Sequence, residues 1–519
     1  MPNRSADTLF QLVKSLKKSE KRNFKLYVKR NSGSGDLKII HLFNALDKMD
    51  TYDEEQLLKK NKSIKKQQLP NSRALLYRQI LSSLRLIKTE ENIDIQLHEQ
   101  LDYARILYNK GLYHQSLRIL DRIKEFAKSN NQSSSLLQVL FFEQKIEALH
   151  ITRSMQDRAE RLAEEVNEVN RHLHSLGDLS NLSLQLYGWY IRHGHARNEK
   201  DEKAVEAYFG QHLPTDHSVY SSFYEKLFLY QSYCWYAFIG QDFLLYYRYA
   251  QKWVDLFERE KFMIAIETAH YIKGMHNLLG AHFDLQNHAK FIVELERFER
   301  FYKSDIVKDN ENNRIQVFVY LHISKINKHF IEGTFTEGLP LVPYIDGKLK
   351  EYELYLDRHR VLVFYYKFAS LYFGSGDYEN AIKFLNKIIN WKVDLRTDLQ
   401  CYSRLLHLIA HYELGNDQIL EYLIKSVYRF MLKMENLSLV EEEILGFLRD
   451  SFKLSPKQLK PEFEKLLARL KTFEKNRYET RVFAYLDIIS WLESKLRNVP
   501  VQDIIREKFL AKKGRKYEL

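Results

Sequence analysis

The residues of this sequence best suited to chemistry are the lysines and arginines near its N-terminus. The first 88 residues contain 20 Lys and Arg against 8 Asp and Glu, whereas the remaining residues contain 60 of each. The entire net charge of +12 therefore lies in this N-terminal segment, and an asymmetry of this kind indicates an anionic partner. The candidate basic patch consists of Lys17, Lys18, Lys21, Arg22, Lys25, Lys29, Arg30, Lys65, Lys66, Arg73 and Arg78.

The basic patch has three interpretations. Clusters of Lys and Arg bind phosphate backbones through counterion release, and Phe24 and Tyr27 would be available to stack on bases. An acidic patch on a protein is the second interpretation, and ordinary solvated faces of short helices are the third. Nucleic acid therefore stays open as a partner of this segment. Residues 1–90 are expected to form a basic helical N-terminal domain, either helix-turn-helix-like or a cap on the helices after residue 90.

Histidine and carboxylate pairs elsewhere do not predict a catalytic or metal site. His407 and His411 stand four residues apart on one helical face, but no acid occupies the hydrolytic position between them and no third ligand is nearby. Glu164 and Glu165 fit a solvated helix face rather than a general acid–base pair. Phosphate-loop, dinucleotide-binding, nucleophile-elbow and zinc-protease motifs are absent from the sequence. We therefore expect no enzyme, no metal and no small-molecule cofactor.

The location of the protein is indicated by its cysteines and by its apolar segments. Cys234 and Cys401 are the two cysteines, which support neither a disulfide framework nor a zinc site and fit a reducing compartment. The N-terminal residues lack the apolar core of a signal peptide, and no window reaches ~18 uninterrupted apolar residues. A cytoplasmic protein without membrane contact is expected. Abundant Tyr and Phe with little Gly and Pro suggest an AT-rich bacterial coding bias.

The elements that must position these side chains are helices. The sequence contains 18 Gly and 8 Pro in 519 residues, which is too few for the frequent turns of an all-β fold. The 34 Tyr and 31 Phe supply large side chains for packing between helices. The fold class is therefore predicted to be all-α, and apolar spacing predicts four or five short helices before residue 88.

From about residue 93 the sequence repeats itself as helix–turn–helix units. The clearest unit spans Tyr365–Ile389, in which Ala369 is the small residue of the first helix and Gly376 makes the turn. A second unit spans Tyr103–Ile123 and turns at Gly111. Small residues let the two helices cross at short distance, and the turn glycine tolerates a left-handed conformation.

Weaker units turn at Gly240, Gly333 and Gly415, and a degenerate one turns near Gly280–Asp284. The turn glycines at 333, 376 and 415 lie 43 and 39 residues apart, which exceeds a period of about 34 residues. The helices are therefore expected to be about one turn longer than in a repeat of that period.

These units resemble the tetratricopeptide repeat. The resemblance implies a right-handed α-solenoid of antiparallel helix pairs over residues 91–475, followed by capping helices and a basic tail in 476–519. It also implies a concave groove lined by the first helix of each pair. Carried over unit by unit, the groove positions are Leu101, Arg105, Tyr108, Asn109, Ile323, Asn327, Tyr366, Ser370, Ile409 and Tyr412.

Two functions are consistent with this organisation. The first is a non-enzymatic interaction scaffold or adaptor that binds a peptide or a segment of a protein partner in the groove. The alternative is a nucleic-acid-binding regulator, in which the basic N-terminal head contacts nucleic acid and the solenoid senses a partner.

Overall fold

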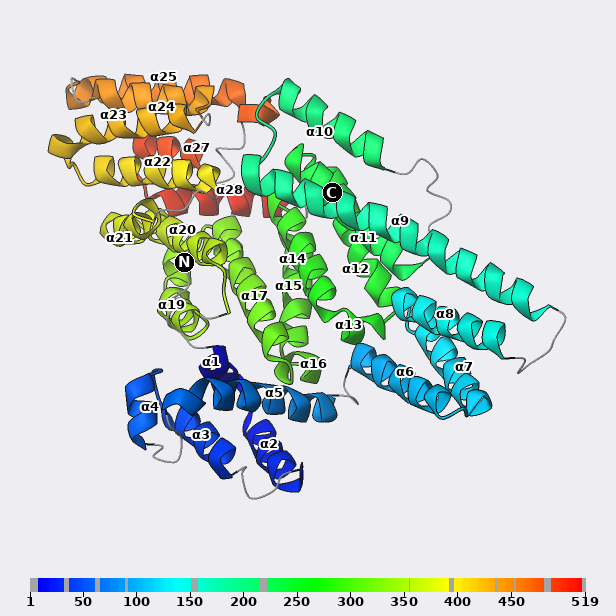
Figure 1. Cartoon of the computed structure of the whole chain (residues 1–519). Coiled ribbons are helices and arrows are strands. Elements are labelled where there is room, and N and C mark those ends of the chain that lie inside the picture. The colour runs from blue at the N-terminus through cyan, green and yellow to red at the C-terminus, as the bar shows by residue number, and fades with distance from the viewer. Residues whose placement is uncertain are drawn as a thin grey trace. The chain divides into compact units, whose positions relative to one another are not determined.

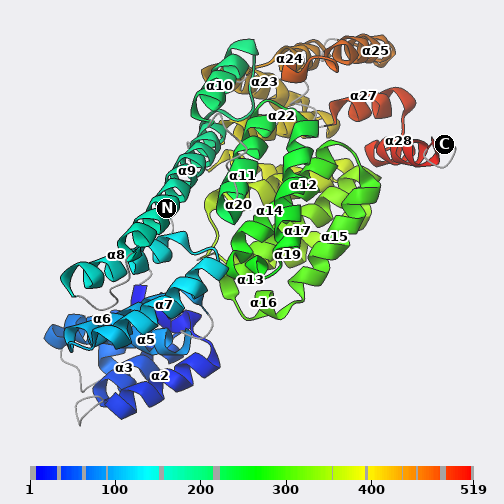
Figure 2. The same ribbon diagram turned by 90° about the vertical axis from the view of Figure 1, so that its right-hand side faces the viewer.

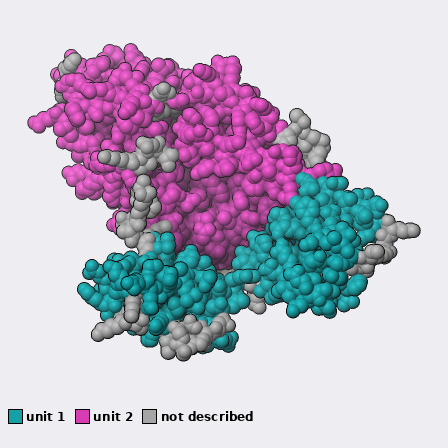
Figure 3. Space-filling model, in the orientation of Figure 1, with its two compact units in different colours: residues 1–170 teal, residues 171–519 magenta. Residues whose placement is uncertain are grey.

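The computed structural model describes residues 8–31, 37–60, 66–88, 92–150, 157–213, 222–353, 355–391, 396–434, 437–451, 454–479 and 487–515. Over these ranges the chain forms helices and turns and no strand (Figure 1). The all-α prediction is therefore confirmed. The chain divides into two compact units, residues 1–170 and 171–519 (Figure 3). The boundaries expected near residues 90 and 475 lie inside these units.

Unit 1 begins with a group of short helices that share one core. The elements are α1 (Thr8–Ser15), α2 (Lys18–Asn31), α3 (Leu37–Lys48), α4 (Glu54–Lys60), the 3-10 helix η1 (Lys66–Gln68) and α5 (Leu69–Lys88). Phe24, Phe43 and Ile80 lie at the centre of this core and are fully or almost fully buried. Asp53 caps α4, because its Oδ1 accepts a hydrogen bond of 3.1 Å from the backbone N–H of Gln56. The short helices predicted for this segment are confirmed.

The second part of unit 1 is a series of longer helices. They are α6 (Ile93–Asn109), α7 (Tyr113–Ser129) and α8 (Ser133–Leu149), followed by α9 (Arg158–His193), which begins in unit 1 and continues into unit 2. Helix α7 packs against both α6 and α8. Gly111 makes the turn between α6 and α7 with φ +75°, which is the left-handed conformation that glycine adopts without strain. The predicted turn of this unit is confirmed.

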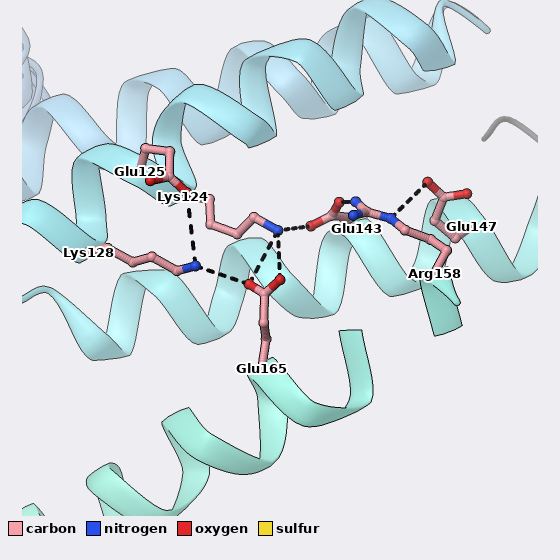
Figure 4. A network of polar contacts seen from close by, with 7 residues as sticks. All are labelled: Lys124, Glu125, Lys128, Glu143, Glu147, Arg158 and Glu165. Carbon is pink, nitrogen blue, oxygen red and sulfur yellow. Dashed lines mark hydrogen bonds and ion pairs between the residues drawn. The ribbon is translucent and has the colours of Figure 1, made fainter. Parts of the chain in front are cut away.

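A buried network of charges joins α7, α8 and the start of α9 (Figure 4). The Lys124 ammonium lies 3.1 Å from a Glu143 carboxylate oxygen and 3.3 Å from Glu165, and the Glu143 side chain has no exposed surface. Arg158 pairs with Glu143 from the other side, and Lys128 reaches Glu165 at 3.3 Å. The cations and carboxylates of three helices neutralise one another, so the network has a structural role and holds these helices together.

Unit 2 contains the remaining helices. They are α10 (Glu199–His212), α11 (Phe223–Ile239), α12 (Phe243–Arg259), α13 (Met263–Ile266), α14 (Thr268–Asp284), α15 (His288–Tyr302), α16 (Asp305–Lys308), α17 (Glu311–Glu332), α18 (Phe335–Gly338), α19 (Leu341–Glu351), α20 (Arg358–Gly374), α21 (Tyr378–Ile389), α22 (Thr397–Glu413), α23 (Asp417–Lys433), α24 (Leu439–Ser451), α25 (Pro456–Phe473), α27 (Ile488–Arg497) and α28 (Val501–Arg515).

Consecutive helices of unit 2 pack as pairs, and the first helix of one pair also contacts the first helix of the next. The pairs include α11 with α12, α14 with α15, α20 with α21 and α22 with α23 (Figure 1). In addition, α14 contacts α17 and α17 contacts α20 (Figure 2). Gly376 and Gly415 form turns with φ +86° and +67°, as predicted. Ala369 and Ala381 have no exposed surface, which is consistent with small residues at the crossing of α20 and α21.

One predicted turn lies a few residues further along the chain than expected. The turn expected at Gly280–Asp284 lies after Asp284, because α14 runs through that whole segment. Gln286 takes the left-handed conformation there, with φ +53°. Gly280 instead lies inside the helix, where an added Cβ would be 3.5 Å from the hydroxyl oxygen of Tyr246.

The last helix, α28, returns to α17. Arg506 donates a hydrogen bond of 3.1 Å to the carbonyl oxygen of Glu332, and Gln502 accepts one of 2.9 Å from the Thr336 hydroxyl. Gly333, at the end of α17, has φ +66°, and a Cβ added to it would lie 2.8 Å from the Cα atom of Arg506. The glycine therefore serves both the left-handed turn and the close approach of α28.

No helix in the described ranges is long and apolar enough to cross a membrane.

Candidate functional site

Several predicted groove residues belong to the core and cannot contact a ligand. Leu101, Ile323, Tyr366 and Ile409 are buried, and Ile409 has no exposed surface. Their inclusion in the groove was wrong for a physical reason, since the apolar side of a first helix faces its neighbours in the pair.

The other groove candidates of unit 2 have mixed surroundings. Asn327 is buried, but its side-chain oxygen accepts a hydrogen bond of 2.6 Å from Lys367. Ser370 donates to the carbonyl oxygen of Tyr366 in its own helix at 2.9 Å. Tyr412 is half-buried beside Trp491. Asn327 therefore contacts a cation of the next first helix, α20.

The groove candidates of unit 1 are more accessible. Arg105 and Asn109 are exposed, and Tyr108 is half-buried. Arg105 pairs with Asp102 at 3.2 Å, and the ring of Tyr108 lies 5.6 Å from that of Tyr113. These three residues belong to α6 of unit 1.

Unit 2 brings together a different set of side chains, which we call the Lys273 site. Its members come from α9 and from the first helices of successive pairs, and they combine cations with aromatic rings. They are Tyr187 of α9, Trp235 of α11, Lys273 and His276 of α14, Tyr320 of α17 and Arg360 of α20.

Lys273 is the centre of the site. Its ammonium nitrogen lies 5.6 Å from the ring centroid of Trp235 and 5.3 Å from that of Tyr320. Cation–ring contacts of this kind are worth about 0.5–2 kcal/mol, depending on how far the cation is desolvated. Among the residues that the structure describes, no carboxylate and no hydrogen-bond acceptor contacts this ammonium group. Lys273 is thus a half-buried cation whose charge is not compensated by an anion.

Arg360 provides a second cation, but its charge is compensated. Its guanidinium lies 5.7 Å from the Tyr320 ring centroid and donates to the Tyr320 hydroxyl at 3.4 Å. Asp357 pairs with it at 3.2 Å. Burial raises the pKa of Tyr320, but Lys273 and Arg360 lower it by more, so that this pKa lies below its ordinary value. The two cations therefore favour the ionised form of the phenol.

His276 packs against Tyr320 as a neutral ring. It stacks on Tyr320 with the ring centroids 4.2 Å apart. Burial first, and then nearby cations led by Lys273, lower the pKa of His276 well below its ordinary value. The imidazole consequently adds no positive charge at neutral pH, and its Nδ1 atom has no hydrogen-bond partner within the described residues.

The accessible rim of the site is aromatic. Tyr187 is 41% exposed, and its ring centroid lies 5.0 Å from that of Trp235. Tyr190, one helical turn further along α9, contacts Trp235 at 5.6 Å and the Arg396 guanidinium at 5.4 Å. Arg396 is held by both carboxylate oxygens of Asp398 at 2.8 Å.

A second polar layer lies deeper along the same helices. Lys367, the donor to Asn327, lies 5.3 Å from the Phe330 ring centroid. Burial lowers the pKa of Lys367 to about 8, although Asp284 raises it. Burial raises the pKa of Asp284 to about 7, against the lowering effect of Lys367. Lys367 and Asp284 thus compensate each other, which again leaves Lys273 as the uncompensated charge.

A spacing in the sequence could have located these residues. Tyr320 and Arg360 are 40 residues apart, and so are Asn327 and Lys367, because α17 and α20 are adjacent first helices in matching register. The prediction chose Tyr366 instead of Lys367, and an error of one residue rotates a position by about 100° around a helix.

The basic-patch candidates lie mainly at the surface of unit 1. Lys17, Lys18, Arg22, Lys29, Arg30, Lys66 and Arg78 are exposed. Lys21 pairs with Asp47 at 2.6 Å, Lys25 lies 5.5 Å from the Phe43 ring centroid, and Arg73 donates to the Tyr52 hydroxyl at 3.0 Å. Lys65 lies outside the described residues.

The two histidines of α22 contact each other rather than an acidic side chain. His407 and His411 have their Nε2 atoms 3.2 Å apart, and Asn416 contacts the Nδ1 atom of His411 at 2.9 Å. Within the described ranges, no three or more His, Cys, Asp or Glu side chains form a group that could hold a metal ion. Cys234 and Cys401 are buried free thiols.

Comparison of the chain with protein-family models, with curated proteins and with solved structures finds no match.

Proposed function

We propose that this protein is a non-enzymatic binding protein whose Lys273 site holds an acidic segment of a protein partner. The observation that carries the proposal is the uncompensated Lys273 ammonium between the rings of Trp235 and Tyr320. A carboxylate that pairs with a partly desolvated ammonium forms a charge-assisted hydrogen bond, which contributes about 1.5–3 kcal/mol.

The aromatic rim supports a peptide rather than a small anion as the ligand. Tyr and Trp side chains supply a large contact area at low conformational entropy and are enriched among the residues that dominate binding energy. Trp235 lies beside the cation and Tyr187 packs against Trp235, so a carboxylate on Lys273 would bring the neighbouring residues of its chain onto these rings.

In this proposal the helix pairs of unit 2 form a tetratricopeptide-like, right-handed solenoid of antiparallel pairs. The contacts between successive first helices support it, as do the left-handed turns at Gly376 and Gly415. The first helices line the concave side in proteins of that type, and all members of the Lys273 site except Tyr187 belong to such helices. The buried free thiols fit a role in the reducing cytoplasm.

The proposal is tested by selecting displayed random peptides on the full-length protein. The selected peptides should be enriched in Asp and Glu. Their affinity, measured by isothermal titration calorimetry, should fall by about 10- to 100-fold in Lys273→Glu, since the lost bond is worth about 1.5–3 kcal/mol.

Lys252→Glu is the matched control. Lys252 also lies over an aromatic ring, with its nitrogen 4.7 Å from the Tyr249 centroid, but it belongs to the second helix α12. It should leave the affinity unchanged, and circular dichroism should show the native helix content for both variants. Selected peptides without acidic residues, or equal loss of affinity in the two variants, would contradict the proposal.

A further inference from the structure

Helix α2 of unit 1 carries a row of cations that the Lys273 site does not use. Lys18, Arg22, Lys25 and Lys29 are separated by four, three and four residues, which places them within an arc of about 60° on an α-helix. Lys18, Arg22 and Lys29 are exposed, and Lys25 is half-buried above the Phe43 ring. We call this row the basic ridge.

The ridge is held rigidly with its cations toward solvent. Phe24 and Val28 of the same helix are each 1% exposed and belong to the core formed by α1–α5. They anchor a different face of α2, about 110° around the helix from the ridge. The ridge is therefore presented by a packed helix with a fixed orientation.

Acidic side chains near α2 are already engaged elsewhere. Glu20 is the one acid within the helix, and it lies on the side away from the ridge, where it accepts a hydrogen bond of 2.8 Å from the backbone N–H of Lys17. Asp47 of α3 pairs with Lys21 at 2.6 Å. The ridge consequently presents one sign of charge.

The side chains beside the ridge are of the kind that contact base edges. Ser19, Asn23 and Leu26 are exposed next to it, Leu26 with 42% of its surface. Asn pairs with adenine, Arg pairs with guanine, and an apolar side chain contacts the thymine methyl group in the major groove.

We propose that α2 binds duplex DNA, with the basic ridge against the phosphates and the Ser19–Asn23–Leu26 side toward the bases. The helix has 14 residues and is therefore about 21 Å long. The major groove of B-form DNA is about 12 Å wide and admits an α-helix.

The same features disfavour other anionic partners. Duplex RNA has a major groove too narrow for a helix. A membrane-surface helix needs an apolar face free to enter the lipid, but Phe24 and Val28 of α2 are buried in the core. An acidic protein surface would use the charges but not Asn23, which lies beside them at helix spacing.

The test uses the full-length protein and a fluorescein-labelled DNA duplex of about 24 base pairs, with binding followed by anisotropy from about 50 to 200 mM salt. The native protein should bind, and its affinity should fall steeply with salt. The variant Lys18→Ala, Arg22→Ala, Lys25→Ala, Lys29→Ala should lose more than tenfold in affinity. Its salt slope should be smaller by about three to four, since each lost phosphate contact removes about one. Alanine keeps the helix propensity of these positions, so the helix content should stay native.

The matched control removes the same charge from unit 2. Lys261, Lys303, Lys433 and Lys460 are exposed, and their joint replacement by Ala should leave DNA binding intact. The proposal is overturned if the native protein does not bind the duplex at low salt, or if ridge and control variants lose affinity equally. Equal or tighter binding of duplex RNA, polyglutamate or phosphatidylserine vesicles through the ridge would overturn it as well.

Discussion

Two lysines of helix α7 should contribute differently to the stability of the fold, because one is buried and the other is exposed. In unit 1, Lys124 is 8% exposed and contacts Glu143, whose side chain has no exposed surface (Figure 4). Lys128 of the same helix contacts Glu165 but is 43% exposed. Breaking a buried pair strands a charge away from water, whereas an exposed pair contributes little because water screens it.

Replacing Lys124 with Met should therefore lower the free energy of unfolding by about 1.5–3 kcal/mol, because Glu143 loses one charged partner in the core but keeps Arg158. Lys128→Met, which removes the same charge from the same helix, should cost less than about 1 kcal/mol. Urea denaturation followed by circular dichroism measures both. Similar values for the two variants would show that the network carries no stability of its own.

At the scale of the helix, two glycines with helical conformation have opposite roles. Gly374 is the last residue of α20, and a Cβ added there would collide with the ring of Phe335 in α18. Gly446 lies inside α24, and a Cβ added there would meet nothing within 4 Å. Both substitutions would raise helix propensity, so packing decides the sign of the effect.

Gly374→Ala should destabilise the protein by about 1–3 kcal/mol, because Phe335 must leave its position. Gly446→Ala should stabilise it by up to about 1 kcal/mol. The melting temperatures of the two variants measure these effects. A rise in melting temperature for Gly374→Ala would contradict the prediction, because it would show that α18 can shift without loss of stability.

The helix is also the scale at which the sequence stops being informative. The turn at Gly376 was predictable because the residue type and the local pattern define it. The rotation of α20 about its axis was not predictable, since Tyr366 and Lys367 are both compatible with a helix. Only the contacts of α20 with α17 place Lys367 beside Asn327. The Lys273 site escaped prediction for the same reason, because only the packing of α11, α14 and α17 brings its cation between the two rings.

Across the whole of unit 2, buried neutral histidines recur on the first helices. Burial lowers the pKa of His282, His322, His359 and His407 to about 4, with nearby cations adding to the effect at each of these sites. The ordinary value is 6.5, so the unfolded chain binds protons at a pH where the folded chain does not.

The contribution of these histidines to stability should therefore be constant above about pH 7 and fall as the pH drops from about 6.5 to about 4. His322 alone should contribute at most about 3 kcal/mol to this loss. Denaturation midpoints across that range measure the effect, and His322→Gln should make the decline shallower. The same pH dependence of the midpoint in the native protein and in His322→Gln would contradict the prediction.

The return of α28 to α17 sets an order on the assembly of unit 2. Arg506 donates a hydrogen bond to the carbonyl oxygen of Glu332, which lies 174 residues earlier in the chain. The end of α17 is therefore synthesised long before α28, the helix that packs on it. Until α28 is synthesised, the glycine at 333 has no helix above it. This surface of the nascent chain is thus open to a chaperone throughout the synthesis of the intervening helices, and it closes when α28 docks.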